Sequence, residues 1–212
     1  MAVRADYMAL GPMGANCIMT VNTDTMETVI FDPGGDLDRL EEYLSRQGYR
    51  PAAIVLTHGH FDHIMAVEGL KEKYGIPVYA MEPEAELLRD PMLNLSYDLG
   101  FGQSIIPDVL LRDGEDLTIC GIDFKVMLTP GHTSGSGCFY CPEGEFLISG
   151  DTLFKGSVGR TDFPTGNTRD IINSCKNILF KLPEETVVYP GHEGLTTIGF
   201  EKMFNFINDY DF

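Results

Sequence analysis

Histidine and carboxylate side chains that can bind a metal ion are concentrated in a few short segments of the chain. Three of the five histidines share the segment His58–His63, which also contains Asp62, and the other two each follow a Pro-Gly pair. Imidazole and carboxylate donors in combination suit zinc, iron or manganese. Seven side chains are candidate ligands, enough for two metals that share one carboxylate: His58, His60, Asp62, His63, His132, Asp151 and His192.

The spacing inside the segment His58–His63 suits a shared metal. Residues two apart on extended backbone point to the same side, so His58 and His60 are expected to face one point. Asp62 and His63 are expected at the start of the next helix, where the chain turns back toward that point. A lone histidine is usually a hydrogen-bonded surface or core residue, but this cluster together with two separate Pro-Gly-His segments favours a metal site.

Each candidate segment follows an apolar run that we expect to be a β-strand. Four such runs end in a histidine or an aspartate and a fifth ends in Asp32; they are 53–57, 124–129, 146–149, 187–189 and 29–31. Loops at strand ends are where a rigid sheet presents functional groups. All five histidines are therefore expected in such loops.

Hydrophobic periodicity divides the chain into short strands and amphipathic helices, with no low-complexity linker between them. Strands are predicted near 3–10, 16–22, 27–31, 52–57, 77–80, 108–111, 117–129, 137–141, 145–149 and 186–189. Helices are predicted at 36–47, 63–74, 82–89, 168–181 and 198–207, with a loop at 90–106 as a candidate rim or lid. Because strands dominate both halves, two packed sheets with helices outside are favoured over one doubly wound parallel sheet.

The composition is that of a globular protein and disfavours two classes of partner. The chain has 212 residues, 43% of them hydrophobic, and its 15 basic and 32 acidic residues give a net charge of −17. We expect one domain, residues 1–212. The absence of a Lys/Arg run disfavours nucleic acid, and no apolar stretch approaches the roughly 20 residues that span a bilayer. The start lacks the apolar core of a signal peptide, so we expect a cytoplasmic protein whose oligomeric state stays open.

The five cysteines are expected to be reduced thiols, because an odd number in a chain of this length does not indicate a disulfide framework. Cys138 and Cys141 have the C-x-x-C spacing of a redox pair. Such a pair needs a helix N-terminus to stabilise its thiolate, whereas these two residues lie on a predicted strand. No redox role is therefore predicted for them.

Several motifs resemble those of the metallo-β-lactamase-fold hydrolases and, among them, the glyoxalase-II-like (hydroxyacylglutathione hydrolase-like) thioesterases. The matching segments are Gly11–Cys17, Thr57–His63, Gly131–Thr133 and Gly150–Phe154. Gly156–Phe163 and Thr196–Gly199 resemble a short, single-domain branch of that group. The resemblance covers nearly the whole chain and implies an α+β fold, an αββα sandwich of two mixed β-sheets flanked by helices.

The resemblance also implies a role for each candidate ligand. The seven divide into two triads and one shared carboxylate: His58, His60 and His132 for the first metal, Asp62, His63 and His192 for the second, and Asp151 for both. Two Zn²⁺ ions are expected, with iron or manganese as alternatives. The implied reaction is hydrolysis of S-lactoylglutathione or a related acyl thioester by a hydroxide that bridges the metals, with Asp62 and Asp151 as catalytic carboxylates.

The expected substrate is a small anionic thioester, because two dications would leave a local positive charge on an acidic chain. Arg160 lies nine residues after Asp151, where glyoxalase II has a basic residue that helps to hold glutathione. Asp32 is expected to support the site by hydrogen bonding. The predicted substrate-binding residues are Arg160, Lys155, Phe154 and Phe163.

Two departures from glyoxalase II bear on glutathione recognition. The sequence ends soon after His192, so the C-terminal helical domain that completes the glutathione site is expected to be missing. Asp162 stands where a tyrosine is expected two residues after the basic position. Both departures concern the thiol carrier and leave the metal chemistry unchanged.

Two other reactions stay open on the same fold. Persulfide dioxygenases share the ligand signature and a segment like 159–163, and by that resemblance one iron would be held by His58, His132 and Asp151. A hydrolase of lactones or other esters would keep the same metal core, because the substrate is selected by the loops. A zinc-binding module without activity is disfavoured, since every ligand position is filled.

Overall fold

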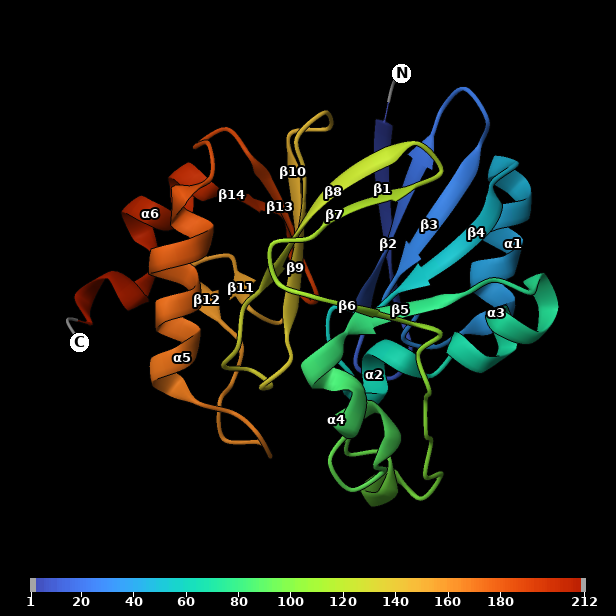
Figure 1. The fold of residues 1–212 in the computed structure, drawn as a ribbon, viewed down its shortest axis with the longest axis horizontal. Helices are drawn as coiled ribbons and strands as arrows, with labels where there is room; N and C mark the ends of the chain where they lie inside the picture. Colours follow the sequence, from blue (N-terminus) through green and yellow to red (C-terminus); the bar gives the residue numbers. More distant parts are fainter. Residues whose placement is uncertain (1–2, 211–212) are drawn as a thin grey trace.

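Two six-stranded β-sheets face each other in the computed structural model of the chain, which describes residues 3–210 (Figure 1). The first sheet, in spatial order, consists of β1 (Val3–Leu10), β2 (Ala15–Asn22), β3 (Glu27–Phe31), β4 (Arg50–Val55), β5 (Val78–Met81) and β6 (Val109–Leu111). The second consists of β14 (Thr196–Thr197), β13 (Val187–Pro190), β10 (Phe146–Gly150), β9 (Gly137–Cys141), β8 (Ile122–Leu128) and β7 (Asp116–Ile119). A separate hairpin pairs β11 (Leu153–Phe154) with β12 (Ser157–Val158).

Helices cover the outer face of each sheet. The α-helices are α1 (Leu37–Gln47), α2 (Phe61–Ile64), α3 (Val67–Tyr74), α4 (Ala85–Arg89), α5 (Thr168–Asn173) and α6 (Ile198–Phe204). Shorter helical turns are η1 (Glu82–Glu84), η2 (Tyr97–Leu99), the π-helical η3 (Ser174–Ile178), η4 (Leu179–Lys181) and η5 (Phe206–Asp209). In Figure 1, α1 and α3 lie on the outer side of the first sheet and α5 and α6 on the outer side of the second.

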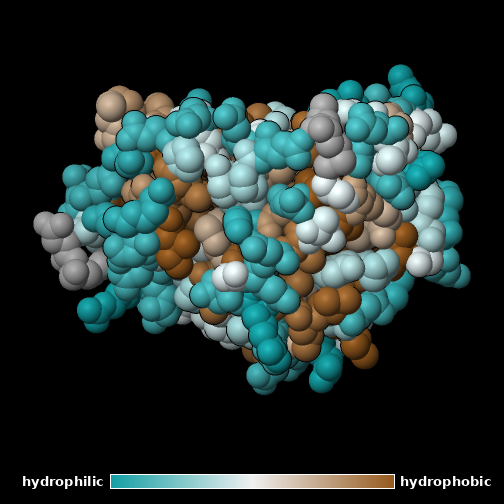
Figure 2. Space-filling model, turned by 45° about the horizontal axis from the view of Figure 1, so that its top comes forward, coloured by the Kyte–Doolittle hydropathy of each residue, from teal (hydrophilic) through white to brown (hydrophobic). Residues whose placement is uncertain are grey.

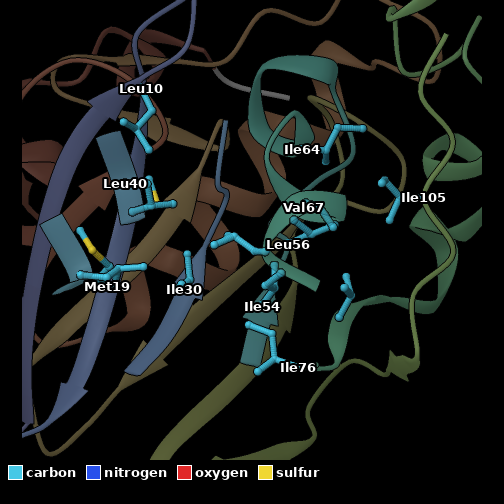
Figure 3. Packing of buried hydrophobic residues seen from close by; sticks show 14 of the residues in the cluster. Leu10, Met19, Ile30, Leu40, Ile54, Leu56, Ile64, Val67, Ile76 and Ile105 are labelled. Carbon is cyan, nitrogen blue, oxygen red and sulfur yellow. The ribbon is translucent and has the colours of Figure 1, made fainter. Parts of the chain in front are cut away.

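Three apolar clusters correspond to the three interfaces between these four layers. The first joins the outer side of the first sheet to α1 and α3 and includes Leu40, Ile54 and Val67 (Figure 3). The second fills the space between the sheets, where Phe31 packs edge-on against Phe124 and Phe139. The third joins the second sheet to α5 and α6. The chain therefore has the expected αββα sandwich.

Both sheets are mixed, as expected, and their parallel pairs place the candidate segments together. β3, β4, β5 and β6 are parallel neighbours in the first sheet, and β10 is parallel to β13 in the second. Parallel strands end on the same edge of a sheet, where functional groups of α/β and α+β proteins gather. Backbone hydrogen bonds from Asn16 to Gly191 (2.7 Å) and from Gly137 to Thr57 (2.8 Å) join the two sheets at this edge.

Three predicted elements differ from those in the structure. The strand predicted over 117–129 is a hairpin, because Cys120 and Gly121 adopt left-handed backbone (φ 55° and 74°), as a two-residue hairpin turn requires. The helix predicted over 63–74 is interrupted at Ala66, whose φ and ψ (−95° and 0°) end the helical pattern. The helix predicted over 168–181 continues from α5 into a π-helical and then a 3₁₀ turn.

The strands β11, β12 and β14 were not predicted, because two-residue strands carry no measurable periodicity.

The surface seen in Figure 2 is mostly hydrophilic, with smaller apolar areas between the polar residues. Within residues 3–210, no helix is long and apolar enough to span a membrane. All five cysteines are free thiols, and burial raises the pKa of Cys138 to about 11, the opposite of what a redox pair needs.

Candidate metal centre

The seven candidate ligands converge at the edge where the strand ends of both sheets meet. His58 and His60 follow β4, and Asp62 and His63 lie in the short helix α2. The other three come from the second sheet, in the loops after β8, β10 and β13: His132, Asp151 and His192. His60 has extended backbone (φ −63°, ψ 149°) and precedes the helix, so the chain turns where the spacing predicted.

His58, His60 and His132 form one compact set of donors. All three are buried, and a ligand nitrogen from each lies within 4.8 Å of the other two. His60 Nδ1 is 2.9 Å from His132 Nε2. The ring of His58 meets those of His60 and His132 edge-on, with centroids 4.9 and 4.7 Å apart. Three imidazoles around one point are a common arrangement for Zn²⁺.

Asp62, His63 and His192 form a second set, whose ligand atoms also lie within 4.8 Å of one another. His192 Nε2 is 3.2 Å from Asp62 Oδ2, and His63 Nε2 is 3.8 Å from the same oxygen. This set mixes imidazole with carboxylate, whereas the first contains imidazole alone. The two sets therefore offer different donor chemistry a short distance apart.

The Asp151 carboxylate lies between the two sets. Its Oδ2 is 3.5 Å from His132 Nε2 of the first set and 3.7 Å from His192 Nε2 of the second. Its Oδ1 is 3.4 Å from His63 Nε2. One side chain therefore faces both donor sets, as a carboxylate that is shared between two metals must.

The donors fit a pair of divalent metal ions. Buried polar atoms are nearly always hydrogen-bonded, yet His58 Nε2, His63 Nε2 and Asp151 Oδ1 are buried in this cluster with no hydrogen-bond partner among the described residues. A metal ion satisfies such atoms without needing a proton between them. Nitrogen and oxygen donors of this kind suit zinc, iron or manganese, and the site does not distinguish among them.

The electrostatics differ between the two sets. Burial and the neighbouring histidines lower the pKa of His58 well below its usual value and the pKa of His60 to about 3, so these rings are neutral. Burial disfavours the charged form of His63, but Asp151 and Asp62 outweigh it and raise its pKa to about 10. Burial likewise opposes ionisation of Asp62, and His63 and His192 still lower its pKa below the ordinary value.

Hydrogen bonds outside the cluster hold three of the imidazoles in place. Asp32 is fully buried and its Oδ2 lies 3.1 Å from His63 Nδ1, which leaves His63 Nε2 to face the cluster. Thr57 donates to Asp32 from its backbone (2.8 Å) and its hydroxyl (2.6 Å) and also contacts His58 Nδ1. His132 Nδ1 donates to the carbonyl oxygen of Arg160 at 2.7 Å. Asp32 thus lies where a supporting residue was expected.

Glu84 is a buried carboxylate beside the site that the sequence did not indicate. It is 1% exposed; its Oε1 accepts from Gly59 N at 2.8 Å, and its Oε2 accepts from Thr133 Oγ1 at 2.9 Å. Burial raises its pKa to about 7. Because Gly59 separates His58 from His60 and Thr133 follows His132, this carboxylate joins the two loops that carry the first donor set.

Asn16 is a second residue that sequence reasoning missed. Its side-chain amide donates to the carbonyl oxygens of Pro190 (2.9 Å) and Glu193 (3.0 Å), on either side of His192. The motif Gly11–Cys17 contains Asn16 and was the available signal, but the motif alone does not tell which loop the amide contacts. The structure shows that it fixes the loop after β13.

Glycine is required at two positions beside the donors. A Cβ at Gly191 would lie 2.1 Å from Asp151 Oδ1 and 2.8 Å from His63 Cε1. A Cβ at Gly159 would lie 1.9 Å from the carbonyl oxygen of Asp151. Both distances are far below van der Waals contact, so a side chain at either position would displace the shared carboxylate or its backbone.

A cavity of about 390 Å³ opens onto the cluster, and three of the four predicted substrate residues line it: Phe154, Arg160 and Phe163. Phe154 meets the His192 ring edge-on and Phe163 does the same with His60. The Arg160 guanidinium lies 3.9 Å from the centroid of the Phe163 ring and forms two hydrogen bonds of 2.7 Å with Asp162.

Lys155 does not line this cavity, and its contact with substrate stays a prediction. It lies at the turn of the β11–β12 hairpin, and its ammonium group is 5.8 Å from the centroid of the Phe200 ring on α6. The hairpin turns the chain back immediately after Phe154. The side chain that follows is therefore directed toward α6 and away from the donors.

Relatives of the chain extend over nearly its whole length. Residues 10–192 match the family described as the Metallo-beta-lactamase superfamily. The chain is 38% identical over 206 residues to the Bacillus subtilis protein named probable metallo-hydrolase YqgX, covering 96% of this chain and 97% of that one. It is 32% identical over 197 residues to hydroxyacylglutathione hydrolase GloC of Haemophilus influenzae, covering 91% and 92%.

Solved structures agree with this assignment. BLEG-1 B3 metallo-beta-lactamase superposes with a TM-score of 0.93 at 41% identity, covering 98% of this chain and all of that one. TTHA1623 in a di-iron-bound form has a TM-score of 0.84 at 36% identity, covering 94% and 98%. ETHE1 from Myxococcus xanthus has a TM-score of 0.79 at 28% identity, covering 97% and 83%. The chain belongs to the metallo-beta-lactamase superfamily.

Proposed function

We propose that this metallo-hydrolase cleaves acyl thioesters with two divalent metal ions. The observation that carries the proposal is the position of Asp151, which faces a three-histidine set and an Asp-His-His set at once. A single-metal site would need only one of these sets. Zinc is the proposed metal, while the di-iron form of TTHA1623 makes iron the natural comparison.

Each metal would have its own triad and would share the Asp151 carboxylate. The first triad is His58, His60 and His132, and the second is Asp62, His63 and His192. When bound, two such ions activate a water molecule near neutral pH and stabilise negative charge on the oxygen of a carbonyl under attack.

The remaining steps belong to the residues of the chain. Asp32 and the Arg160 carbonyl oxygen accept hydrogen bonds from His63 and His132, which keeps Nε2 of each ring turned to the cluster. Asp62 stays ionised because its pKa is lowered, so its carboxylate can orient the attacking water. Phe154 and Phe163 border the donors and exclude bulk water from the reacting carbonyl.

Thioesters are favoured as substrates for two reasons. A thiol leaving group has a pKa of about 8.5, so it departs as a thiolate with little help from an acid. The Haemophilus influenzae relative is named a hydroxyacylglutathione hydrolase, which is a thioester hydrolase by name. S-lactoylglutathione is therefore the first substrate to test.

The one-iron dioxygenase is less well supported by the geometry. It would hold its metal with His58, His132 and Asp151, yet His60 Nδ1 lies 2.9 Å from His132 Nε2 and belongs to the same donor set. The second triad would then have no function. A hydrolase of lactones or other esters would use the same donors and differs only in substrate.

The test is turnover of S-lactoylglutathione beside thioesters of other thiols, with metal content measured on the same preparation. We expect two metal ions per chain and hydrolysis of at least one thioester. Asp151→Asn should abolish turnover, whereas Asp98→Asn, on the exposed turn η2, should not change it. A single iron with oxygen uptake on glutathione persulfide, or no thioester hydrolysis by the metal-loaded protein, would contradict the proposal.

A further inference from the structure

The walls of the cavity beyond the donors are apolar. Six apolar side chains from four separate segments line it: Met13, Phe61, Leu95, Phe154, Val158 and Phe163. Cavities lined mainly by apolar side chains, with few polar groups to fix orientation, bind ligands that are themselves largely apolar. The polar residues of the lining are five of the donors together with Ser157, Arg160 and Glu193.

Leu95 reaches this wall through a strained backbone. Its φ is +68°, a left-handed conformation that is costly for leucine. The buried side chain of Asn94 holds the loop by donating to the carbonyl oxygen of Gln103 (2.9 Å) and accepting from Ser96 N (3.0 Å). The Asn94 carbonyl also accepts from Phe61 N at 2.9 Å, next to the ligands. Strain that the surroundings maintain beside a site indicates a functional position.

The charged side chains of the cavity wall beyond the donors do not favour an anionic substrate. Among the described residues outside the seven donors, the charged residues that line the cavity are Arg160 and Glu193. Arg160 is paired with Asp162 through two hydrogen bonds of 2.7 Å, although both side chains are exposed and solvent screens the pair. A carboxylate of the substrate that lies against this wall would have to compete with Asp162 for Arg160 and would face Glu193 as well.

We infer that the substrate presents an apolar acyl chain to Leu95 and carries no carboxylate near the cavity walls, and that Leu95 determines this specificity. The inference rests on the proposed thioesterase function and narrows it, because it makes S-lactoylglutathione a poor substrate. It replaces the expectation of a small anionic thioester with an uncharged, apolar one.

The test compares substrates that differ in one feature on the zinc-loaded protein. The thioesters are lactoyl, acetyl and hexanoyl derivatives of N-acetylcysteamine, which is neutral, and S-lactoylglutathione and hexanoylglutathione, which are anionic. We expect kcat/KM for hexanoyl-N-acetylcysteamine to exceed that for S-lactoylglutathione at least ten-fold. Hexanoylglutathione should fall between them, since it keeps the apolar chain and adds the carboxylates.

Leu95→Asn removes the apolar side chain and keeps the backbone, because asparagine accepts left-handed conformation readily. It should lower kcat/KM for the hexanoyl substrate on the order of ten-fold, as expected when apolar contacts are lost from a pocket, and lower kcat/KM for the acetyl substrate much less. The matched control is Leu99→Asn, an exposed leucine of the same loop that does not line the cavity. It should change neither substrate.

Two results would overturn the inference while leaving the thioesterase function intact. These are a preference for S-lactoylglutathione, or an equal loss on acetyl and hexanoyl substrates in Leu95→Asn. If the metal-loaded protein hydrolyses none of the thioesters, the proposed function fails. The inference about an apolar ligand is then tested by measuring the binding of hexanoate and adipate. Hexanoate should then bind at least ten-fold more tightly than adipate, which differs only in a terminal carboxylate; equal or tighter binding of adipate would refute it.

Discussion

Replacing Glu84 by glutamine should change how the stability of the metal-free protein depends on pH. Burial raises the pKa of this carboxyl from 4.5 to about 7, although Gly59 N and Thr133 Oγ1 donate to it. The folded chain therefore holds the Glu84 proton more tightly than the unfolded chain. Between the two pKa values the folded state binds more protons than the unfolded state. The stabilisation that comes from protonated Glu84 is therefore fully present below pH 4.5 and is lost as the pH rises through 7.

The magnitude follows from the size of the shift. One pKa unit corresponds to about 1.4 kcal/mol, so a shift from 4.5 to about 7 corresponds to about 3 kcal/mol. Glutamine resembles the protonated carboxyl in size and does not titrate. The free energy of unfolding of the wild type minus that of Glu84→Gln should therefore fall by about 3 kcal/mol between pH 4.5 and pH 8.

Urea unfolding of both proteins at several pH values, in the presence of a chelator, measures this difference. The other titrating groups are common to both chains and cancel. Glu82→Gln is the matched control, because Glu82 forms an exposed ion pair with Arg112. This substitution should change the free energy of unfolding by less than about 1 kcal/mol at every pH. A difference that stays constant with pH, or that rises, would show that the hydrogen bonds to Glu84 hold it ionised and that burial is not the dominant cause.

Three further predictions concern the donors and their supports. Asp32→Asn keeps the left-handed backbone at this position (φ 49°) but weakens the acceptor for His63 Nδ1. Metal affinity, measured by competition with a chelator, should therefore fall about 10- to 100-fold. Unchanged affinity would mean that metal binding does not need this hydrogen bond. Gly191→Ala should lower kcat/KM on the order of 100-fold by displacing Asp151, with an unchanged circular dichroism spectrum. Gly194→Ala, where a Cβ would meet nothing within 4 Å, should be neutral, and equal effects of the two would refute the steric reasoning. Removing the metal should lower Tm by roughly 10 °C, since binding at 1,000 times Kd adds about 4 kcal/mol; a Tm that does not respond to a chelator would contradict binding at this edge.

The donors could be predicted from the sequence because they lie in regular positions. All seven follow apolar runs that become strands, and two of those runs lead into the same Pro-Gly-His motif. Strand periodicity and turn residues are local properties, so they can be read without knowledge of the fold. The αββα arrangement followed from the distribution of strands in both halves together with the family resemblance.

Contacts that depend on tertiary packing could not be predicted in this way. Glu84 is one of 32 acidic residues and nothing in its local sequence distinguishes it; its position becomes significant only because the loops of Gly59 and Thr133 close around it. Lys155 follows Phe154 directly, but an unpredicted two-strand hairpin turns it away from the cavity. Asp162 marked a departure from a family pattern, whereas its pairing with Arg160 required the coordinates.

Each donor set takes side chains from both sheets, which ties the chemistry of the site to the packing of the fold. His58 and His60 come from the first sheet and His132 from the second; Asp62 and His63 come from the first and His192 from the second. Contacts between the sheets support this junction, among them those made by Glu84, by Asn16 and by the Gly137–Thr57 hydrogen bond. A metal at either set would add another link between the sheets, so its binding free energy would oppose their separation. Substitutions in the layer between the sheets, such as those at Phe31, should therefore reduce metal affinity as well as stability, because the relative position of the sheets determines the distances between the donors.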